Sequence, residues 1–249
     1  MKIVFSPRAV HSLKAGITIF LALTLFVGII AISRPANAVA SLKTVTICPT
    51  VVLDAGHGGF DGGATSITGT LEKDINLQIA KKTSSALRLF GFDVVMTRKD
   101  DSALANTKKD DMYARLDIIK NTPDSIFVSI HQNHYSQGKY FGAQIFYGSS
   151  GEQESRAIAL ILQENFRQYL NPENTRQAKT APSDLFLFKK APQPSVLIEC
   201  GFLSNYEEAH LLENDEYQTK IALTIAQSIC EYYQNAGIER NQKYGSTEV

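Results

Sequence analysis

The chain has 249 residues, of which 44% are hydrophobic, and it carries 25 basic side chains, 25 acidic side chains and three cysteines. This length suffices for one α/β domain with a sizeable core, or for two small domains at most. The first 40 residues hold four basic and no acidic side chains, so the remainder has 21 basic and 25 acidic residues. Its net charge of −4 does not favour nucleic acid binding.

A long uncharged apolar run, residues 15–32, lies near the N-terminus and is preceded by basic residues. The sequence Ala36-Asn37-Ala38 that follows suits signal peptidase. A run this long can also remain in the bilayer as an anchor. We therefore expect residues 1–40 to be a signal peptide, which is slightly favoured, or a membrane anchor. The basic residues on its N-terminal side indicate that the rest of the chain lies outside the cytoplasm.

Strands and helices alternate in the rest of the sequence. Predicted strands cover residues 45–53, 92–97, 126–130, 143–147, 185–188 and 195–198, and predicted helices cover residues 72–90, 112–120, 152–170 and 216–233. This alternation predicts a single α/β domain whose largely parallel, mixed sheet is flanked by helices. We expect the domain to span residues 41–235, between the export or anchor helix and a polar C-terminal tail of residues 236–249.

The first candidate site residues flank a glycine-rich loop. The first predicted strand leads into Asp54-Ala55-Gly56-His57-Gly58-Gly59, where glycines let the imidazole leave the strand end without steric cost. A phosphate-binding loop is the alternative, but the spacing matches neither G-x-x-x-x-G-K-[ST] nor G-x-G-x-x-G. Glu72 opens the next helix, where the helix dipole favours an acidic residue in any case. The short glycine-rich loop over residues 62–69 can nevertheless bring the side chains of Glu72 and His57 close enough to bind one ion.

His131 follows the apolar strand of residues 126–130, and His134 lies three residues further on. A lone histidine at a strand end is more often structural than a ligand, and the two histidines together can be interpreted as a ligand pair. Strand-to-loop geometry does not bring side chains i and i+3 together as a helix does. We therefore expect His131 alone to belong to the site, and His134 to be an exposed loop residue or a substrate contact.

Glu199 ends the apolar run of residues 195–198. A carboxylate buried there is costly unless it is paired or lies near a cation. The alternative is a surface acid at a strand end, which the apolar Phe202 and Leu203 make less favourable. Arg115 lies one helical turn from Asp111, so we expect an ion pair that matters for folding more than for catalysis; contact with a substrate carboxylate is the alternative.

The three cysteines, Cys48, Cys200 and Cys230, are too few and too scattered for a disulfide framework or a thiolate metal site. One disulfide is possible, and small buried hydrophobic residues are at least as good an interpretation. Cys200 stands beside Glu199 in a strand that leads into a glycine turn. We expect it to have no role in the chemistry.

A catalytic zinc needs three protein ligands of nitrogen or oxygen type, an open position for water and a further carboxylate that moves protons. His57, Glu72, His131 and Glu199 meet that requirement. His57, His131 and Glu199 each follow the end of a predicted strand, which is the edge where open α/β sheets place ligands. Residues more than a hundred positions apart are thereby expected to meet at one point.

Five ordered motifs resemble those of zinc-dependent N-acetylmuramoyl-L-alanine amidases of the amidase 3 type. They are DAGHGG from Asp54, LEKD from Leu71, the arginine of ARLDIIKN, SIHQN from Ser129 and IECGFLSN from Ile198, and the resemblance runs from about residue 45 to about residue 233. It implies Zn²⁺ held by His57, Glu72 and His131, with Glu199 as general acid and base. His134 and Cys200 depart from the usual pattern, but neither is one of these four positions.

The resemblance implies a peptidoglycan hydrolase that cleaves the amide between N-acetylmuramic acid and the L-alanine of the stem peptide. Within the family, GAQIFY, NTRQAK and the lack of a wall-binding repeat look most like sporulation amidases, which act in spore cortex maturation before muramic-lactam formation. The alternatives are a zinc peptidase acting within the stem peptide and a catalytically silent wall-binding protein. Beyond peptidoglycan, a protein partner for activation or localisation is possible, and the membrane is a further partner through residues 15–32 if these are not cleaved.

Overall fold

The computed structural model describes residues 49–245, with side chains for residues 49–236. The predicted export or anchor segment and Cys48 lie outside the described residues. Among the helices of the described part, none combines the length and the apolar character needed to cross a bilayer.

The described part contains a six-stranded sheet with the strand order β2-β1-β3-β6-β4-β5. The strands are β1 (Thr50–Ala55), β2 (Asp93–Met96), β3 (Ser125–Asn133), β4 (Gln144–Tyr147), β5 (Lys179–Thr180) and β6 (Ser195–Phe202). Strands β2, β1, β3 and β6 pair in parallel, whereas β4 pairs antiparallel with β6 and parallel with β5. The expected single α/β domain with a largely parallel, mixed sheet is therefore confirmed.

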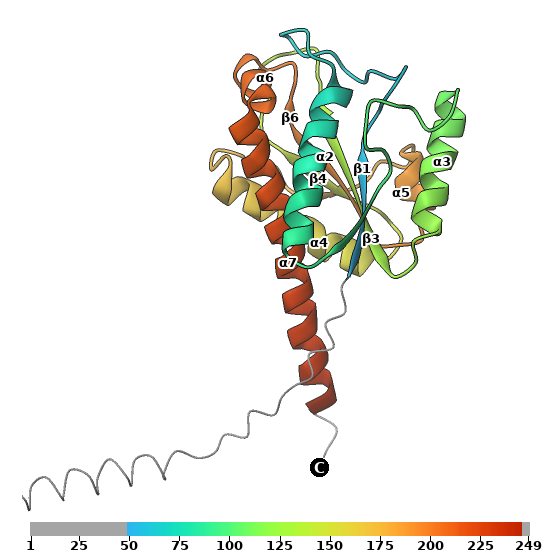
Figure 1. Cartoon of the computed structure of the whole chain (residues 1–249). Coiled ribbons are helices and arrows are strands. Elements are labelled where there is room, and N and C mark those ends of the chain that lie inside the picture. The colour runs from blue at the N-terminus through green and yellow to red at the C-terminus, as the bar shows by residue number, and fades with distance from the viewer. Residues whose placement is uncertain (1–48, 246–249) are drawn as a thin grey trace, which may run out of the picture. The chain divides into compact units, whose positions relative to one another are not determined.

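Helices cover both faces of this sheet (Figure 1). They are α2 (Glu72–Leu89), α3 (Lys108–Lys120), α4 (Glu152–Tyr169), α5 (Phe186–Lys190), α6 (Tyr206–Glu213) and α7 (Asp215–Gly245). Helices α2, α4 and α7 pack on one face, and α3 and α5 pack on the other. This three-layer arrangement buries the central strands on both sides, which is why β1, β3 and β6 are nearly continuous apolar runs.

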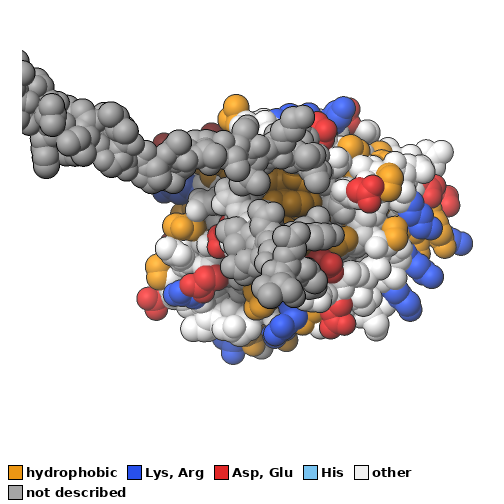
Figure 2. All heavy atoms as spheres, turned by 90° about the horizontal axis from the view of Figure 1, so that it is seen from below, with side chains coloured by type: hydrophobic (Ala, Val, Ile, Leu, Met, Phe, Trp, Pro, Cys, Tyr) orange, Lys and Arg blue, Asp and Glu red, His pale blue; other side chains and the backbone are white. Residues whose placement is uncertain are grey.

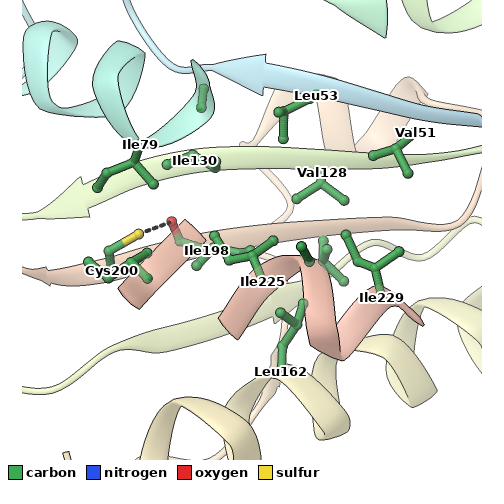
Figure 3. Close-up of a cluster of buried hydrophobic side chains, with 14 of the residues drawn as sticks. Val51, Leu53, Ile79, Val128, Ile130, Leu162, Ile198, Cys200, Ile225 and Ile229 are labelled. Atoms are coloured by element: carbon green, nitrogen blue, oxygen red, sulfur yellow. Dashed lines mark hydrogen bonds between the residues drawn. The ribbon is translucent and has the colours of Figure 1, made fainter. Parts of the chain in front are cut away.

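The two faces of each strand contribute to two separate cores, because successive side chains of a strand point in opposite directions. Val51 and Leu53 join the larger core under α2, α4 and α7, whereas Val52 joins the smaller core under α3 and α5. Figure 3 shows the larger core, in which Ile225 and Ile229 of α7 lie against the strands. The same alternation decides which strand residues face the candidate site.

The sheet edge at which the parallel strands begin lies at the bottom of Figure 1, and Figure 2 looks onto that side. Acidic and basic side chains are interspersed over its visible surface. Charge alone therefore marks no binding face on the visible part of this side.

Several elements differ from the expectation. The predicted strand over residues 185–188 is wrong, because this segment enters the short helix α5; a brief apolar run is ambiguous between the two structures. The closing helix α7 continues to Gly245 instead of ending at residue 233. Helix α6 and the two-residue strand β5 were not predicted. The start of α6 has a sequence signal, since the side chain of Asn205 accepts a hydrogen bond from the Glu208 amide at 3.0 Å.

Candidate active site

The candidate site lies at the carboxyl edge of the parallel strands. His57 is two residues beyond β1, and Glu72 is the first residue of α2. His131 and Glu199 lie within β3 and β6, not past their ends as expected, and they are direct partners in the strand register. Because neighbouring strands are about 4.8 Å apart, this register alone brings the two residues together.

His57, Glu72 and His131 form a compact cluster in which one potential ligand atom of each residue lies within 4.8 Å of the others. Nε2 of His57 is 3.2 Å from Oε2 of Glu72, and Nδ1 of His131 is 3.0 Å from Oε1 of the same carboxylate. The three side chains come from three different elements. Two imidazole nitrogens thus converge on one carboxylate.

Glu72 is buried, with 4% of its surface exposed, and its carboxylate is held from several sides. The amide of Ala64 donates to Oε2 at 2.9 Å, and the amide of Gln132 donates to Oε1 at 3.1 Å. Asn76, one helical turn further along α2, also donates to Oε1. Burial opposes ionisation of Glu72, but the hydrogen bonds and charges of the two histidines outweigh it and hold the pKa well below its ordinary value.

At two glycines beside the cluster, the backbone leaves no room for a side chain. A Cβ atom on Gly56 would lie 2.1 Å from Nε2 of His131, and one on Gly63 would lie 2.6 Å from Oε2 of Glu72. His57 itself has a φ of 61°, in the left-handed region that non-glycine residues rarely adopt. The glycines at positions 56 and 63 are therefore required, because the three clustered side chains approach the main chain so closely.

Two buried arginines hold the strained loop. Arg115 donates to the carbonyl oxygens of Ala55 at 3.0 Å and His57 at 2.6 Å, and it forms ion pairs with Asp54 and Asp111. Arg98 donates to the carbonyl oxygens of Ala55 at 2.9 Å and of Gly56 at 3.0 Å. The expected ion pair between Arg115 and Asp111 is confirmed, and the contact with Asp54 explains why Arg115 is buried.

Glu199 has a different environment from Glu72. Its Oε2 atom is buried and has no hydrogen-bond partner among the described residues. Burial raises the pKa of Glu199 to about 7, although the charge of His131 acts in the opposite direction. A carboxyl group with such a pKa can accept and release a proton near neutral pH. Two carboxylates of one site are thus held in different protonation regimes.

A small cavity of about 150 Å³ adjoins these residues. His57, His131 and Glu199 line its polar side, and Met112 of α3 and Phe186 of α5 line its apolar side. A carboxyl group that lines a cavity and has one oxygen without a partner is suited to contact a substrate or a water molecule. The cavity therefore gives Glu199 access to a reacting group.

The donor set fits a zinc ion. Two imidazole nitrogens and a carboxylate are ligand types that catalytic zinc sites use, and three of them leave a fourth position open. Burial lowers the pKa of His131, but the hydrogen bond and charge of Glu72 outweigh this and raise it to about 9. The cluster thus attracts positive charge, as a cation site should. Asp61 supports it from outside, since its Oδ2 is 3.0 Å from Nδ1 of His57, which leaves Nε2 to face Glu72.

The structure brings together all four predicted site residues. His134 lies in a loop and is exposed, in agreement with one of its two expected placements. Cys200 is a free, buried cysteine whose pKa is raised by burial, and its Sγ faces the larger core near the Ile198 carbonyl (Figure 3). Cys230 is also free and is half-buried.

Asp61, Asn76 and Arg98 support the site but were not predicted from the sequence. Short sequence spacing could have indicated two of them, because Asp61 lies four residues after His57 and Asn76 lies four residues after Glu72. Arg98 had no such signal, because the loop carbonyl groups to which it donates are 42 and 43 residues away in the chain.

Comparison with known proteins gives a consistent result. Residues 51–231 match the amidase 3 model of N-acetylmuramoyl-L-alanine amidases. The germination-specific N-acetylmuramoyl-L-alanine amidase of Bacillus subtilis is 36% identical over 196 residues, which cover 75% of this chain and 81% of the relative.

Solved structures agree. The CwlD amidase of Clostridioides difficile, in complex with the GerS lipoprotein, is 40% identical with a TM-score of 0.70 and covers 75% of this chain and 98% of its own. The amidase AmiC2 of Nostoc punctiforme is 31% identical with a TM-score of 0.66 and covers 75% of this chain and 97% of its own.

Proposed function

Because the chain belongs to the amidase 3 family of N-acetylmuramoyl-L-alanine amidases, we propose that it hydrolyses the amide between the lactyl group of N-acetylmuramic acid and the L-alanine of the stem peptide. One observation carries this proposal. The orphaned carboxylate of Glu199 borders a cavity beside a cluster of two histidines and one glutamate, which is the arrangement that metal-assisted amide hydrolysis needs.

His57, Glu72 and His131 would hold zinc, through Nε2 of His57, the Glu72 carboxylate and Nδ1 of His131. When bound, Zn²⁺ supplies Lewis-acid polarisation of the scissile carbonyl and acidifies water. Glu199 accepts the proton of the attacking water and then donates it to the nitrogen of L-alanine as that amine leaves. Its pKa of about 7 suits both halves of this exchange.

Mass spectrometry of muropeptides after digestion tests the reaction. The amidase releases stem peptides with a free N-terminal L-alanine and leaves intact N-acetylmuramic acid. A peptidase acting within the stem would instead leave L-alanine attached to the sugar. A silent wall-binding protein would release nothing. The buried acid Glu199 beside the two histidines and Glu72 makes that alternative less favourable.

We also propose that the protein acts outside the cytoplasm on spore cortex peptidoglycan, before muramic-lactam formation, and that a lipoprotein partner supports it. The support is the likeness to the germination-specific amidase of Bacillus subtilis and to CwlD, which was solved with the GerS lipoprotein. Export or anchoring through residues 15–32 remains a prediction of the sequence. Spores of normal lactam content after disruption of the gene would contradict the cortex role.

A further inference from the structure

A second cavity, of about 400 Å³, lies at the β4–β5 side of the sheet and takes no part in the chemistry described above. Its lining comes from the loop before β4, from β4 itself and from the segment that leads into β5. The lining residues are Lys139, Tyr140, Phe141, Gln144, Lys179 and the run 173–177.

Positive charge dominates this cavity. Lys139, Arg176 and Lys179 line it, whereas Glu173 is the acidic residue of the lining. None of the three cations forms an ion pair with another described residue. The domain as a whole is not basic, so a cluster of unpaired cations around one cavity indicates an anionic ligand.

Arg176 is the best-fixed of these cations. Its Nε donates to the carbonyl oxygen of Phe141 at 2.9 Å, and its guanidinium lies 4.6 Å from the centre of the Phe202 ring. The side chain is half-buried, and no described protein group accepts a hydrogen bond from its two terminal nitrogens. A guanidinium held in this way has the geometry to bind a carboxylate with little loss of side-chain entropy.

The strand register connects this cavity to the catalytic residues. Glu199 pairs with His131 of β3 on one side and with Gln144 of β4 on the other. Paired residues on adjacent strands project from the same face, so His131, Glu199 and Gln144 form a row about 4.8 Å apart from strand to strand. The cationic cavity begins at the third member of this row.

We propose that the cationic cavity binds the free carboxylate of the second residue of the stem peptide, counted from the scissile bond. This inference rests on the proposed amidase function, because the reacting amide must lie at Glu199. An extended peptide advances about 3.4 Å per residue, so a chain that starts at Glu199 passes Gln144 within two residues. The glutamate residue of the stem, whose α-carboxylate is free when it is linked through its side chain, is the group within reach.

Two muramoyl tripeptides that differ only at the second residue, glutamate or its α-amide, test the proposal with the zinc-loaded protein. The wild-type kcat/KM should favour the glutamate substrate by roughly 5-fold, the upper range for exposed ion pairs. In the double variant Lys139→Gln/Lys179→Gln, and in Arg176→Gln, the ratio of kcat/KM for the glutamate substrate to that for the amide substrate should fall towards one. Lys220→Gln, a charge change of the same kind on exposed α7, should keep the wild-type ratio.

Calorimetric titration with the two free product peptides gives a readout that does not need catalysis. The glutamate peptide should bind more tightly than its amide, and the cavity variants should lose that difference. Equal kcat/KM for both substrates, in a protein that hydrolyses them, would overturn the inference and leave the amidase function intact. Preferential peptide binding without hydrolysis would support the cavity and contradict the amidase function. Impaired digestion of sacculi by the cavity variants, with an unchanged ratio of kcat/KM for the two substrates, would indicate that the cavity contacts another anionic group of the wall, and would overturn the inference.

Discussion

Nη1 of Arg115 lies 2.6 Å from Oδ1 of Asp54, and both side chains are almost completely buried. The pair connects α3 to the end of β1, three residues before His57. Ser129 of β3 and Thr97 donate to the same carboxylate, at 2.6 Å and 2.7 Å. This network fixes the strand ends from which the site residues project.

Replacement of Arg115 by alanine should act mainly on folding. The change leaves Asp54 and Asp111 buried without their cation, which costs about 3–5 kcal/mol in comparable cases. Thermal unfolding should therefore show a large fall in Tm, and Arg115→Lys should recover part of it. An unchanged Tm with a raised KM would indicate a substrate contact instead.

The same pair makes stability depend on acidity. Burial opposes the charged form of Asp54, but Arg115 and the hydrogen bonds outweigh it and lower the pKa to about 2. In the unfolded chain the Asp54 carboxylate takes up a proton near pH 4, its ordinary pKa. The ionised Asp54 therefore contributes about 2 kcal/mol to the free energy of unfolding above pH 4, and this contribution is lost as the pH falls towards 2. In urea unfolding between pH 6 and pH 2, the stability difference between wild type and Asp54→Asn should narrow below pH 4. A constant difference would contradict this.

The fold was largely predictable because its signals are local. Ile75 and Ile79 recur on one face of α2, and the buried strands are short apolar runs. The prediction of a strand over residues 185–188 was wrong because its signal is also only local: four apolar residues fit a strand or a helix equally well. The four central site residues could be identified because each follows an apolar run or opens a helix. Supporting contacts such as that of Arg98 with Ala55 arise only in the folded chain, and the roles assigned to the four residues remain predictions.

Removal of any proposed zinc ligand should lower the metal content sharply. His57→Ala, Glu72→Ala and His131→Ala each delete one of three donors, and the two that remain bind a metal much more weakly. Inductively coupled plasma mass spectrometry on the purified proteins measures bound zinc directly. His134→Ala is the matched control, because this nearby histidine is exposed and should leave the metal content unchanged. Near-stoichiometric zinc in His57→Ala would refute the assignment.

Asp61 should influence the metal without binding it. Its carboxylate faces Nδ1 of His57 and fixes the ring so that the other nitrogen points to Glu72. Losing such a partner typically reduces metal affinity by about 10- to 100-fold. Competition with a chelator should show this loss for Asp61→Asn, while Asp117→Asn, at an exposed position on α3, should match wild type. Equal affinity in the two variants would leave Asp61 with no positioning role.

Glu199→Gln should separate proton transfer from metal binding. The amide has nearly the same size as the carboxyl group and can occupy the same place beside the cavity, but it cannot accept the proton of the attacking water. Activity on a muramoyl peptide should fall by about 100-fold or more, the usual scale for loss of a positioned proton carrier. Zinc content and Tm, measured on the same preparation, should stay close to wild type because His57, Glu72 and His131 are untouched. Parallel loss of zinc would make Glu199 a ligand and would overturn the proposed division of roles between the two glutamates.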